Sequence, residues 1–497
     1  MKKNLLFCLA IPFLLVGCST KKPDVANTAD NPNPQTPVNE DEVVPNFVVD
    51  DKDYNDFFNH GNDVEVEVKL TNSVAKKTND YGKSNNWSKE EMYHPCDVII
   101  RINGEERFNA PETGIRLKGN MSKEHDPAFV DSDGHLQYNA HFKLHFGKTF
   151  DSPEDNDYYT HEWTDSAERK ARDKRKFGGM KRLDLKWNRN NDQTFTKEAY
   201  AKYCYRDAGV VAQNMNLIKF TLKTDNDSKT YIYQAFETVD SQSLKRYYGK
   251  DGGEGNLYKG LYARANLTTS SISGNNLNPE SVNNTEPSYP LKTNEEISDH
   301  TLMKNVVSVL NKKSTAEEFV KEFKDIAEVD NILRYLAMSW VVGNPDDMKN
   351  NANNTYFYFN TINNNLLIIP YDDDRCFGIL DNWEVDMSEL PADSTRMAGK
   401  SAGGGKVWVD NPLVWRLTIN ETDSSVSYSE KWPMVQEYHN RYINYAREYM
   451  NKYLDANKFK EFTNGFVNAP SKDITLGGSL NQTFAQYAEM KKQHLTK

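Results

Sequence analysis

The feature that most constrains the fold is a change in the spacing of apolar residues near residue 260. Before this point, short runs such as 64–68 and 98–102 alternate apolar and polar residues, which is typical of half-buried strands. After it, apolar residues recur at helical spacing within 316–326, 329–342 and 428–456. The sequence therefore predicts an α+β fold, with a β-rich first part and a mainly helical second part.

Several shorter signals add detail to this division. Residues 196–207 predict a helix that Thr196 caps and Gly209 follows, and Asn103-Gly104 predicts a tight turn. Residues 264–300 are rich in Asn, Ser, Thr, Pro and Glu, so they are interpreted as a surface loop or connection. Further strands are predicted at 114–117, 141–146, 217–222, 231–236, 356–359 and 366–369.

The N-terminus has the pattern of an export signal. Lys2 and Lys3 precede an apolar run over 5–16, which is too short to span a bilayer and fits a signal peptide. The run ends in Leu-Val-Gly-Cys, which resembles a bacterial lipobox, and in that pattern the chain is cut before Cys18 and Cys18 carries lipid. The alternative is an ordinary signal peptide with an incidental cysteine. We expect a lipid-anchored protein of the bacterial cell envelope, attached to the membrane through Cys18 by a solvated tether over 18–46.

Composition excludes some classes of protein. Lys plus Arg number 61 and Asp plus Glu number 72, which gives a net charge of −11, so a protein that mainly coats nucleic acid is not expected. A mean hydropathy of −0.79 excludes a multi-span membrane protein. The cysteines Cys96, Cys204 and Cys376 are widely spaced and odd in number, so they indicate neither a disulfide framework nor a metal knuckle, although two of them could pair.

Carboxylates and amides gather between residues 340 and 378. Asp346 lies in a polar turn after an apolar helix, Asn353 and Asn354 follow it, and Asp372 and Asp374 come directly after a predicted hairpin. In protein kinases one Asp orients or deprotonates the acceptor hydroxyl, while an Asn and a later Asp hold the metal ions on the transferred phosphoryl group. From spacing alone, a calcium-stabilised loop or a set of solvated turns remains an alternative.

These residues resemble the CotH family of atypical protein kinases, named for a spore-coat protein. The resemblance covers about residues 47–455. Asp347 stands where the family has Gly, Lys118 where Arg is usual, and Tyr371 where Trp is usual. The segments that carry the resemblance are 114–122, 142–146, 181–187, 206–210, 237–240, 255–259, 344–347, 353–358, 370–378 and 411–413.

The resemblance implies a bilobal atypical protein-kinase-like fold and a chemistry. The order would be signal peptide 1–17, tether 18–46, β-rich N-terminal lobe 47–263, connection 264–300 and helical C-terminal lobe 301–497. The activity would be transfer of the γ-phosphoryl group of ATP to Ser/Thr hydroxyls of an unidentified protein substrate, with Mg²⁺ or Mn²⁺. The alternative is a catalytically inactive structural or binding lipoprotein of the envelope with the same fold.

The resemblance also implies roles for individual residues. Asp346 would be the catalytic acid of the loop. Asp372, Asp374 and one of Asn353 and Asn354 would hold the metal, with the contribution of Asp373 left open. The residues expected at the nucleotide are Lys143 as the phosphate-binding lysine, Arg116 and Lys118 as further phosphate contacts, and Glu198 or Glu237 as the partner of the lysine.

Overall fold

The computed structural model describes residues 42–84, 92–151, 159–261, 264–280, 286–379, 386–394, 410–420, 428–470 and 481–495. The predicted signal peptide, Cys18 and nearly all of the predicted tether lie outside these residues. Cys96, Cys204 and Cys376 are buried free thiols. Among the described residues, no helix has the length and apolar character that crossing a bilayer requires.

The β-rich region is a closed barrel of seven strands in the order β1-β2-β3-β4-β5-β7-β6. Neighbouring strands are antiparallel, except that β1 and β6 are parallel and close the barrel. Asn103 and Gly104 join β2 to β3 with φ values of 53° and 82°, which confirms the predicted tight turn. The strands are β1 (Val64–Lys69), β2 (His94–Ile102), β3 (Glu105–Leu117), β4 (Phe142–His145), β5 (Arg182–Lys186), β6 (Met215–Lys223) and β7 (Ser228–Glu237).

Alternation along the strands decides what faces the inside of the barrel. In β1, Val64, Val66 and Val68 are fully buried in the barrel core. In β5, Leu183 and Leu185 belong to the same core. Successive side chains of a strand point to opposite faces, so Asp184 and Lys186 lie on the outer face of the barrel. The predicted strands of this region are therefore confirmed, and the polar positions of β5 face the rest of the molecule.

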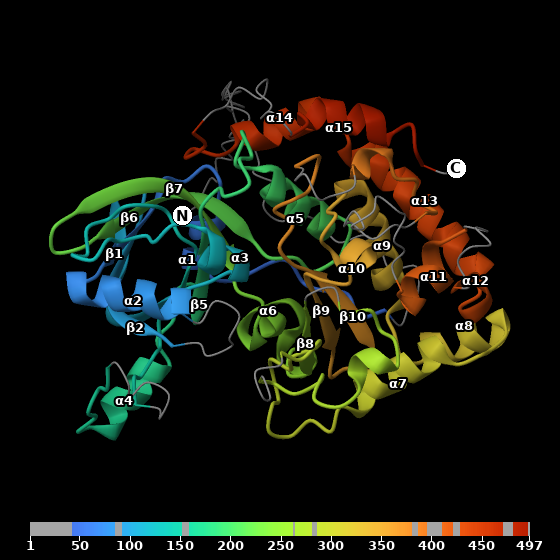
Figure 1. The fold of residues 1–497 in the computed structure, drawn as a ribbon, viewed down its shortest axis with the longest axis horizontal. Coiled ribbons are helices and arrows are strands. Elements are labelled where there is room, and N and C mark those ends of the chain that lie inside the picture. The colour runs from blue at the N-terminus through green and yellow to red at the C-terminus, as the bar shows by residue number, and fades with distance from the viewer. Residues whose placement is uncertain are drawn as a thin grey trace, which may run out of the picture.

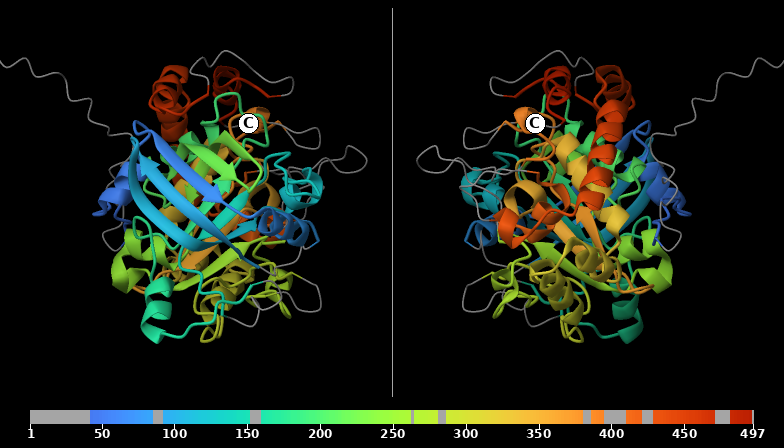
Figure 2. Two further views of the ribbon diagram at one scale, coloured as in Figure 1. Left: turned by 90° about the vertical axis from the view of Figure 1, so that its left-hand side faces the viewer. Right: turned by 90° about the vertical axis from the view of Figure 1, so that its right-hand side faces the viewer.

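The helical region lies beside the barrel (Figure 1). Figure 2 shows the barrel strands from one side and this region from the other. Helix α9 (Val329–Val342) is buried along its length from residue 330 onward, and α13 (Gln436–Tyr453) packs against it. The predicted helices 196–207, 316–326 and 329–342 are confirmed, and 428–456 forms two helices. The other helices are α1 (Lys52–Phe58), α2 (Asn72–Ser84), α3 (Asn120–His125), α4 (Ser166–Asp173), α5 (Lys197–Asp207), α6 (Ser241–Gly252), α7 (Thr301–Asn311), α8 (Ala316–Lys324), α10 (Met348–Asn351), α11 (Pro412–Thr418), α12 (Tyr428–Lys431), α14 (Ala456–Asn464) and α15 (Phe484–Lys491).

A second sheet links the two regions. It has three antiparallel strands in the order β10-β9-β8, with β8 (Asn256–Gly260), β9 (Thr355–Phe359) and β10 (Leu366–Pro370). Both faces of the hairpin β9–β10 are buried, because alternate residues belong to two different apolar clusters. β8 precedes the division predicted at residue 263, yet it pairs with β9, so the sheet and the predicted division do not coincide.

Two segments without helix or strand over most of their length still pack firmly. Within the predicted surface connection 264–300, Leu267, Leu277 and Tyr289 are buried in the large apolar cluster of the helical region. Residues 42–49 run in extended conformation across α6, where Phe47 is 2% exposed, and Glu42 forms a buried ion pair with Arg334 of α9. The start of the described chain is thus fixed against the helical region.

Candidate active site

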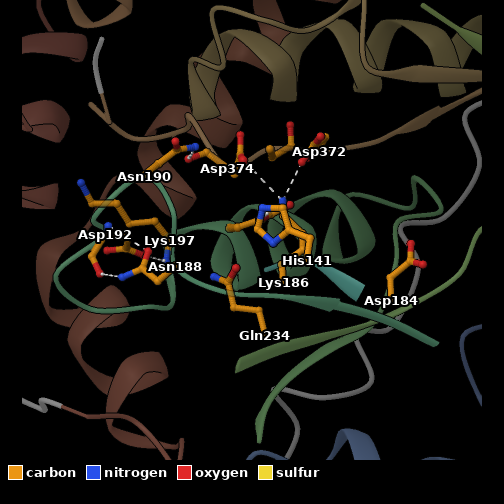
Figure 3. Close-up of polar contacts among 12 residues, drawn as sticks. His141, Asp184, Lys186, Asn188, Asn190, Asp192, Lys197, Gln234, Asp372 and Asp374 are labelled. Carbon is orange, nitrogen blue, oxygen red and sulfur yellow. Dashed lines mark hydrogen bonds and ion pairs between the residues drawn. The ribbon is translucent and has the colours of Figure 1, made fainter. Parts of the chain in front are cut away.

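The centre of the candidate site is the ammonium group of Lys186, the last residue of β5. Its Nζ lies 2.6 Å from Oδ1 of Asp372 and 3.5 Å from Oδ2 of Asp374 (Figure 3). It also lies 2.9 Å from Oε2 of Glu198. Lys186 and Glu198 are buried, whereas the side chains of Asp372 and Asp374 are 35% and 29% exposed. One ammonium group therefore joins three carboxylates, two of which remain accessible from solvent.

Helix α5 brings Glu198 to Lys186. Glu198 lies in the first turn of α5, which follows β5 after the loop 187–196. Thr196 occupies the predicted cap position, but its hydroxyl contacts Thr463 instead of the helix. The carboxylate of Asp192 accepts the hydrogen bond from the backbone N–H of Lys197, 2.8 Å away, so Asp192 anchors the helix start.

The three consecutive acids after β10, Asp372, Asp373 and Asp374, have different partners. Asp372 has a left-handed φ of 55°, which costs of order 1–3 kcal/mol for a residue with a side chain and often occurs at functional sites. Asp373 is 1% exposed and forms a buried ion pair of 2.7 Å with Lys202 of α5. Its other oxygen accepts a hydrogen bond from Asn344. Asp372 and Asp374 face Lys186, so Asp373 has a structural partner of its own.

The three carboxylates around Lys186 have different proton affinities. Burial raises the pKa of Glu198 to about 7, and the neighbouring Asp374 and Asp372 add to this effect against Lys186. Burial also raises the pKa of Asp374, with help from Asp372. At Asp372 burial acts in the same direction, but Lys186 and Lys118 outweigh it and hold the pKa below its ordinary value. Asp372 is thus the carboxylate that stays ionised most firmly.

Asp346 is held by a ring of amides. Gly343 ends α9 with a left-handed φ of 62°, and a Cβ at this position would lie 2.0 Å from the hydroxyl of Tyr487. The chain then turns so that Asp346 accepts hydrogen bonds from Asn351 (2.6 Å), Asn353 (3.1 Å) and Asn354 (3.0 Å). Burial raises the pKa of Asp346, and the charges of Asp372 and Asp374 raise it further. Asp346 therefore feels the electrostatic field of the two acids that face Lys186.

Its neighbour Asp347 has a different environment. The Asp347 carboxylate is 2% exposed and caps α10 by accepting hydrogen bonds from the backbone and side chain of Asn350. The hydroxyl of Ser339 donates a further hydrogen bond to it. Asp347 thus stabilises the turn, whereas Asp346 accepts hydrogen bonds from three side-chain amides and does not cap a helix.

A basic group lies beside this centre on the outer face of the barrel. Asp184, two residues before Lys186, is 2% exposed and forms ion pairs with two lysines. Its Oδ2 lies 3.0 Å from Nζ of Lys118, and its Oδ1 lies 3.5 Å from Nζ of Lys143. Burial would raise the pKa of Asp184, but Lys118, Lys143 and Arg116 lower it to about 2. The guanidinium of Arg116 also lies 5.3 Å from the ring centroid of Tyr93.

Two predicted pairings are corrected by these contacts. Glu198 pairs with Lys186 and not with Lys143, because the side chain of Lys143 points to Asp184. Glu237, the alternative partner, is buried in a separate cluster where it accepts hydrogen bonds from Arg246, Tyr54 and Tyr247. In the register of β5 and β7, Glu237 lies opposite Leu183, whereas Gln234 lies opposite Lys186, and the hydrogen bonds of Glu237 go to its own cluster.

Sequence reasoning missed Lys186, Lys202, Asn344 and Asn351. One signal for Lys186 was present, since Arg182, Asp184 and Lys186 alternate with two leucines and the strand leads into the helix that carries Glu198. A pocket opens beside Lys186 toward the following loop, lined among others by Trp187, Asn188, Asn190, Gln234 and Asp374. Figure 3 shows the side chains of Asn188, Asn190, Gln234 and Asp374 together with Lys186.

A search of the described ranges finds no group of three or more His, Cys, Asp or Glu side chains arranged to hold a metal ion. Of the three carboxylates around Lys186, those of Asp372 and Asp374 are the partly exposed ones. Asn353 and Asn354, predicted as metal ligands, direct their amide N–H groups to Asp346.

Comparison with models of protein families gives a match. The family model described as CotH kinase protein matches residues 158–469, which is more than half of the chain and includes Lys186, Glu198, Asp346, Asp372 and Asp374. A search of curated proteins finds no match.

Proposed function

Because the chain belongs to the CotH kinase protein family, we propose that it is an exported, lipid-anchored protein kinase that transfers the γ-phosphoryl group of ATP to Ser/Thr hydroxyls of a protein. The observation that carries the proposal is the Lys186 ammonium group, which pairs with Glu198 and with the two acids after β10. Protein kinases require a strand lysine paired with a helix glutamate, beside an Asp that holds metal.

The wider arrangement supports the same proposal. The lysine comes from the barrel, the glutamate from the next helix, and the acids from loops of the helical region. We therefore propose that the barrel and the helical region act as the two lobes of a kinase-like fold, with the nucleotide between them. Lys186 would contact the phosphates, and Lys118 and Lys143 would add positive charge beside it, because ATP phosphates are strongly anionic.

The donor atoms of the site fit Mg²⁺ or Mn²⁺. Mg²⁺ prefers oxygen ligands and is usually held by one or two carboxylates together with substrate phosphates, so a cage of three protein acids is not required. Asp372 and Asp374 would hold the ion, and the amide oxygen of Asn353 or Asn354 would be a further ligand. When bound, the ion supplies positive charge that neutralises charge on the transferred phosphoryl group.

Asp346 would act on the acceptor. Its three amide donors fix the orientation of the carboxylate, and such orientation is what a group needs to position a hydroxyl and accept its proton. The Ser/Thr hydroxyl would lie against Asp346 while its oxygen attacks the γ-phosphorus. The bond between the γ-phosphorus and the β–γ bridging oxygen would break, ADP would leave with that oxygen, and the hydroxyl proton would pass to the Asp346 carboxylate.

The proposed location rests on the N-terminal sequence. Cleavage before Cys18 and lipid attachment there would leave the tether to hold the folded part off the membrane. Membrane fractionation tests this proposal, since Cys18→Ser should move the protein out of the membrane fraction or leave it as uncut precursor. Normal membrane attachment of Cys18→Ser would contradict it.

The experiment for the activity combines calorimetric titration of ATP with radiolabel transfer from ATP, each with Mg²⁺ and with Mn²⁺. The wild-type protein should bind ATP and label itself or a generic acceptor protein. Asp372→Ala should lose metal-dependent ATP binding and transfer, whereas Asp325→Ala, at an exposed acid directly after α8, is the matched control. Absence of ATP binding by the wild type with either metal would favour the structural or binding lipoprotein instead.

A further inference from the structure

A second charged site lies next to the Lys186 centre, and it has the opposite charge balance. Its floor is the outer face of β3, β4 and β5, where Lys143 pairs in register with both Arg116 and Asp184. Lys118 follows β3 and reaches the same carboxylate of Asp184. One buried acid here serves two lysines, with Arg116 close enough to lower the pKa of that acid.

The opposite wall comes from the second sheet. Lys259 of β8 places its Nζ 4.4 Å from the ring centroid of Tyr371, the residue before Asp372. The Nζ of Lys118 lies 5.9 Å from the centroid of the same ring. Tyr356 packs edge-on against Tyr371 at 5.2 Å and stands opposite Lys259 in the register of β8 and β9. Lysines from the barrel and from the second sheet thus meet at one tyrosine.

Lys259 lacks an ion pair among the described residues, although its side chain is largely covered. Burial lowers the pKa of Lys259 to about 8, and the positive charges of Lys292, Lys118 and Lys143 lower it further, opposed by Asp372. Asp372 itself contacts Lys186 at 2.6 Å and is therefore already paired. Lys118 and Lys143 therefore share Asp184, whereas Lys259 is a third lysine beside them that forms no ion pair in the part of the chain that the structure describes.

Such an excess of cations is costly unless a ligand offsets it. A desolvated ammonium group without a counterion costs several kcal/mol, whereas a phosphate group offers several charged oxygen acceptors to several lysines at once. The ring of Tyr371 contributes a weaker attraction to Lys259 and Lys118. An anion with more than one negative charge would offset the excess of cations.

We propose that Lys259, together with Lys118 and Lys143, forms a binding site for a phosphate-bearing anion that is held between the barrel and the second sheet. Lys259 is the specificity-determining member, because it is the one of these three lysines that has no carboxylate partner among the residues that the structure describes. The anion site stands on its own geometry, whereas its assignment to the phosphates of a nucleotide donor rests on the proposed function. The other source of the same chemistry is a phosphate group on the acceptor protein.

The test uses inorganic triphosphate, without divalent metal, in calorimetric titrations of the full chain. The wild type should bind it, and Lys259→Gln should weaken binding by about tenfold or more, since a charge-assisted hydrogen bond is worth about 1.5–3 kcal/mol. Lys259→Arg should retain most of the affinity because it keeps the charge. Lys250→Gln, an exposed position on α6, is the matched control and should bind as the wild type does.

Thermal unfolding of each variant shows whether a loss of binding reflects a loss of folding. Lack of triphosphate binding by the wild type, or equal affinity of folded Lys259→Gln and wild type, would overturn the anion site. Competition then identifies the source, because displacement by ATP assigns the site to the donor, and displacement by a phosphoserine peptide alone assigns it to the acceptor.

The outcome is independent of the kinase proposal. A wild-type protein that binds triphosphate through Lys259 but transfers no phosphate supports the anion site and contradicts the kinase activity. A protein that transfers phosphate while Lys259→Gln binds triphosphate normally supports the activity and overturns the anion site.

Discussion

Two neighbouring places on the outer face of β5 have opposite charge balances. At Lys186, one ammonium group faces three carboxylates. At Asp184, two residues earlier, one carboxylate faces two lysines, and a third lysine approaches from β8. The same strand therefore separates a place suited to a cation from a place suited to an anion. A metal–phosphate ligand combines both.

The pair of Asp373 and Lys202 shows what a balanced arrangement looks like. Both side chains are almost fully buried, the charges match one to one, and Asn344 satisfies the remaining carboxylate oxygen. Buried charges that are matched in this way hold parts of a structure together, whereas unmatched charges indicate a ligand. This distinction separates structural acids from candidate catalytic acids in the run 372–374.

The largest effect is expected at Asp346. Asp346→Asn should lower kcat for phosphoryl transfer by about 10²–10⁴-fold, because a general base acts in the transition state. Affinity for ATP should change little, since the ground-state nucleotide does not depend on the base. Steady-state transfer assays and ATP titration measure the two quantities separately. A kcat within tenfold of wild type would show that Asp346 is not the base.

The next effect concerns the balanced pair. Lys202→Met should lower the free energy of unfolding by about 3–5 kcal/mol, because it leaves Asp373 buried without its counterion. Urea denaturation measures the loss. The double variant Lys202→Met with Asp373→Leu should recover much of it, as both charges are then removed. Unchanged stability of Lys202→Met would contradict the structural assignment of this pair.

A smaller loss of stability is expected when Asp184 is changed. Asp184→Asn should lower the free energy of unfolding at neutral pH by about 1.5–3 kcal/mol, since two charge-assisted contacts are lost. The pKa of Asp184 is lowered to about 2 from 3.8, so its stabilisation is present above pH 3.8 and disappears as pH falls through about 2. The difference between wild type and Asp184→Asn should therefore shrink in acid; a constant difference would contradict this account.

The smallest expected effect is a change in the free energy of unfolding with pH, caused by Glu198. The folded pKa of Glu198 is about 7 against an ordinary 4.5, so the folded protein binds more protons than the unfolded chain between these values. The contribution of Glu198 to the free energy of unfolding should consequently decrease as pH rises from about 4.5 to about 7. Denaturation of Glu198→Gln over this range should show a flatter profile than wild type. Identical pH profiles of the free energy of unfolding for wild type and Glu198→Gln would contradict the raised pKa of Glu198.

Much of the fold follows from periodicity in the sequence. The structure confirms the strands predicted from alternation in 64–68 and 98–102, since each buries one face. It also confirms the helix predicted from apolar spacing in 329–342, where nearly every residue of α9 is buried. The closure of the barrel through the parallel pair β1 and β6 could not be predicted, since strand order depends on contacts far apart in the chain. The packing of 42–49 on α6 was missed for the same reason.

The site was predictable in part. Asp346, Asp372 and Asp374 stand out as carboxylates at the ends of apolar elements, and the structure brings Asp372 and Asp374 to one ammonium group. Which lysine supplies that group was not readable, because Lys143 and Lys186 both lie on outward positions of barrel strands. Only the register across β4 and β5 shows that Lys143 lies opposite Asp184 and that Lys186 extends beyond it to α5.

The central claim is that Lys186, and not Lys143, is the lysine of the transfer site, and rates of γ-phosphoryl transfer in Lys186→Met and Lys143→Met test it most directly. Both variants must first give the folded circular-dichroism signal of wild type. Lys186→Met should lose about 10²–10³-fold in rate, the usual result of removing one preorganised electrostatic contact, and Lys143→Met should lose less than tenfold. A loss confined to Lys143→Met, with Lys186→Met as active as wild type, would contradict the account.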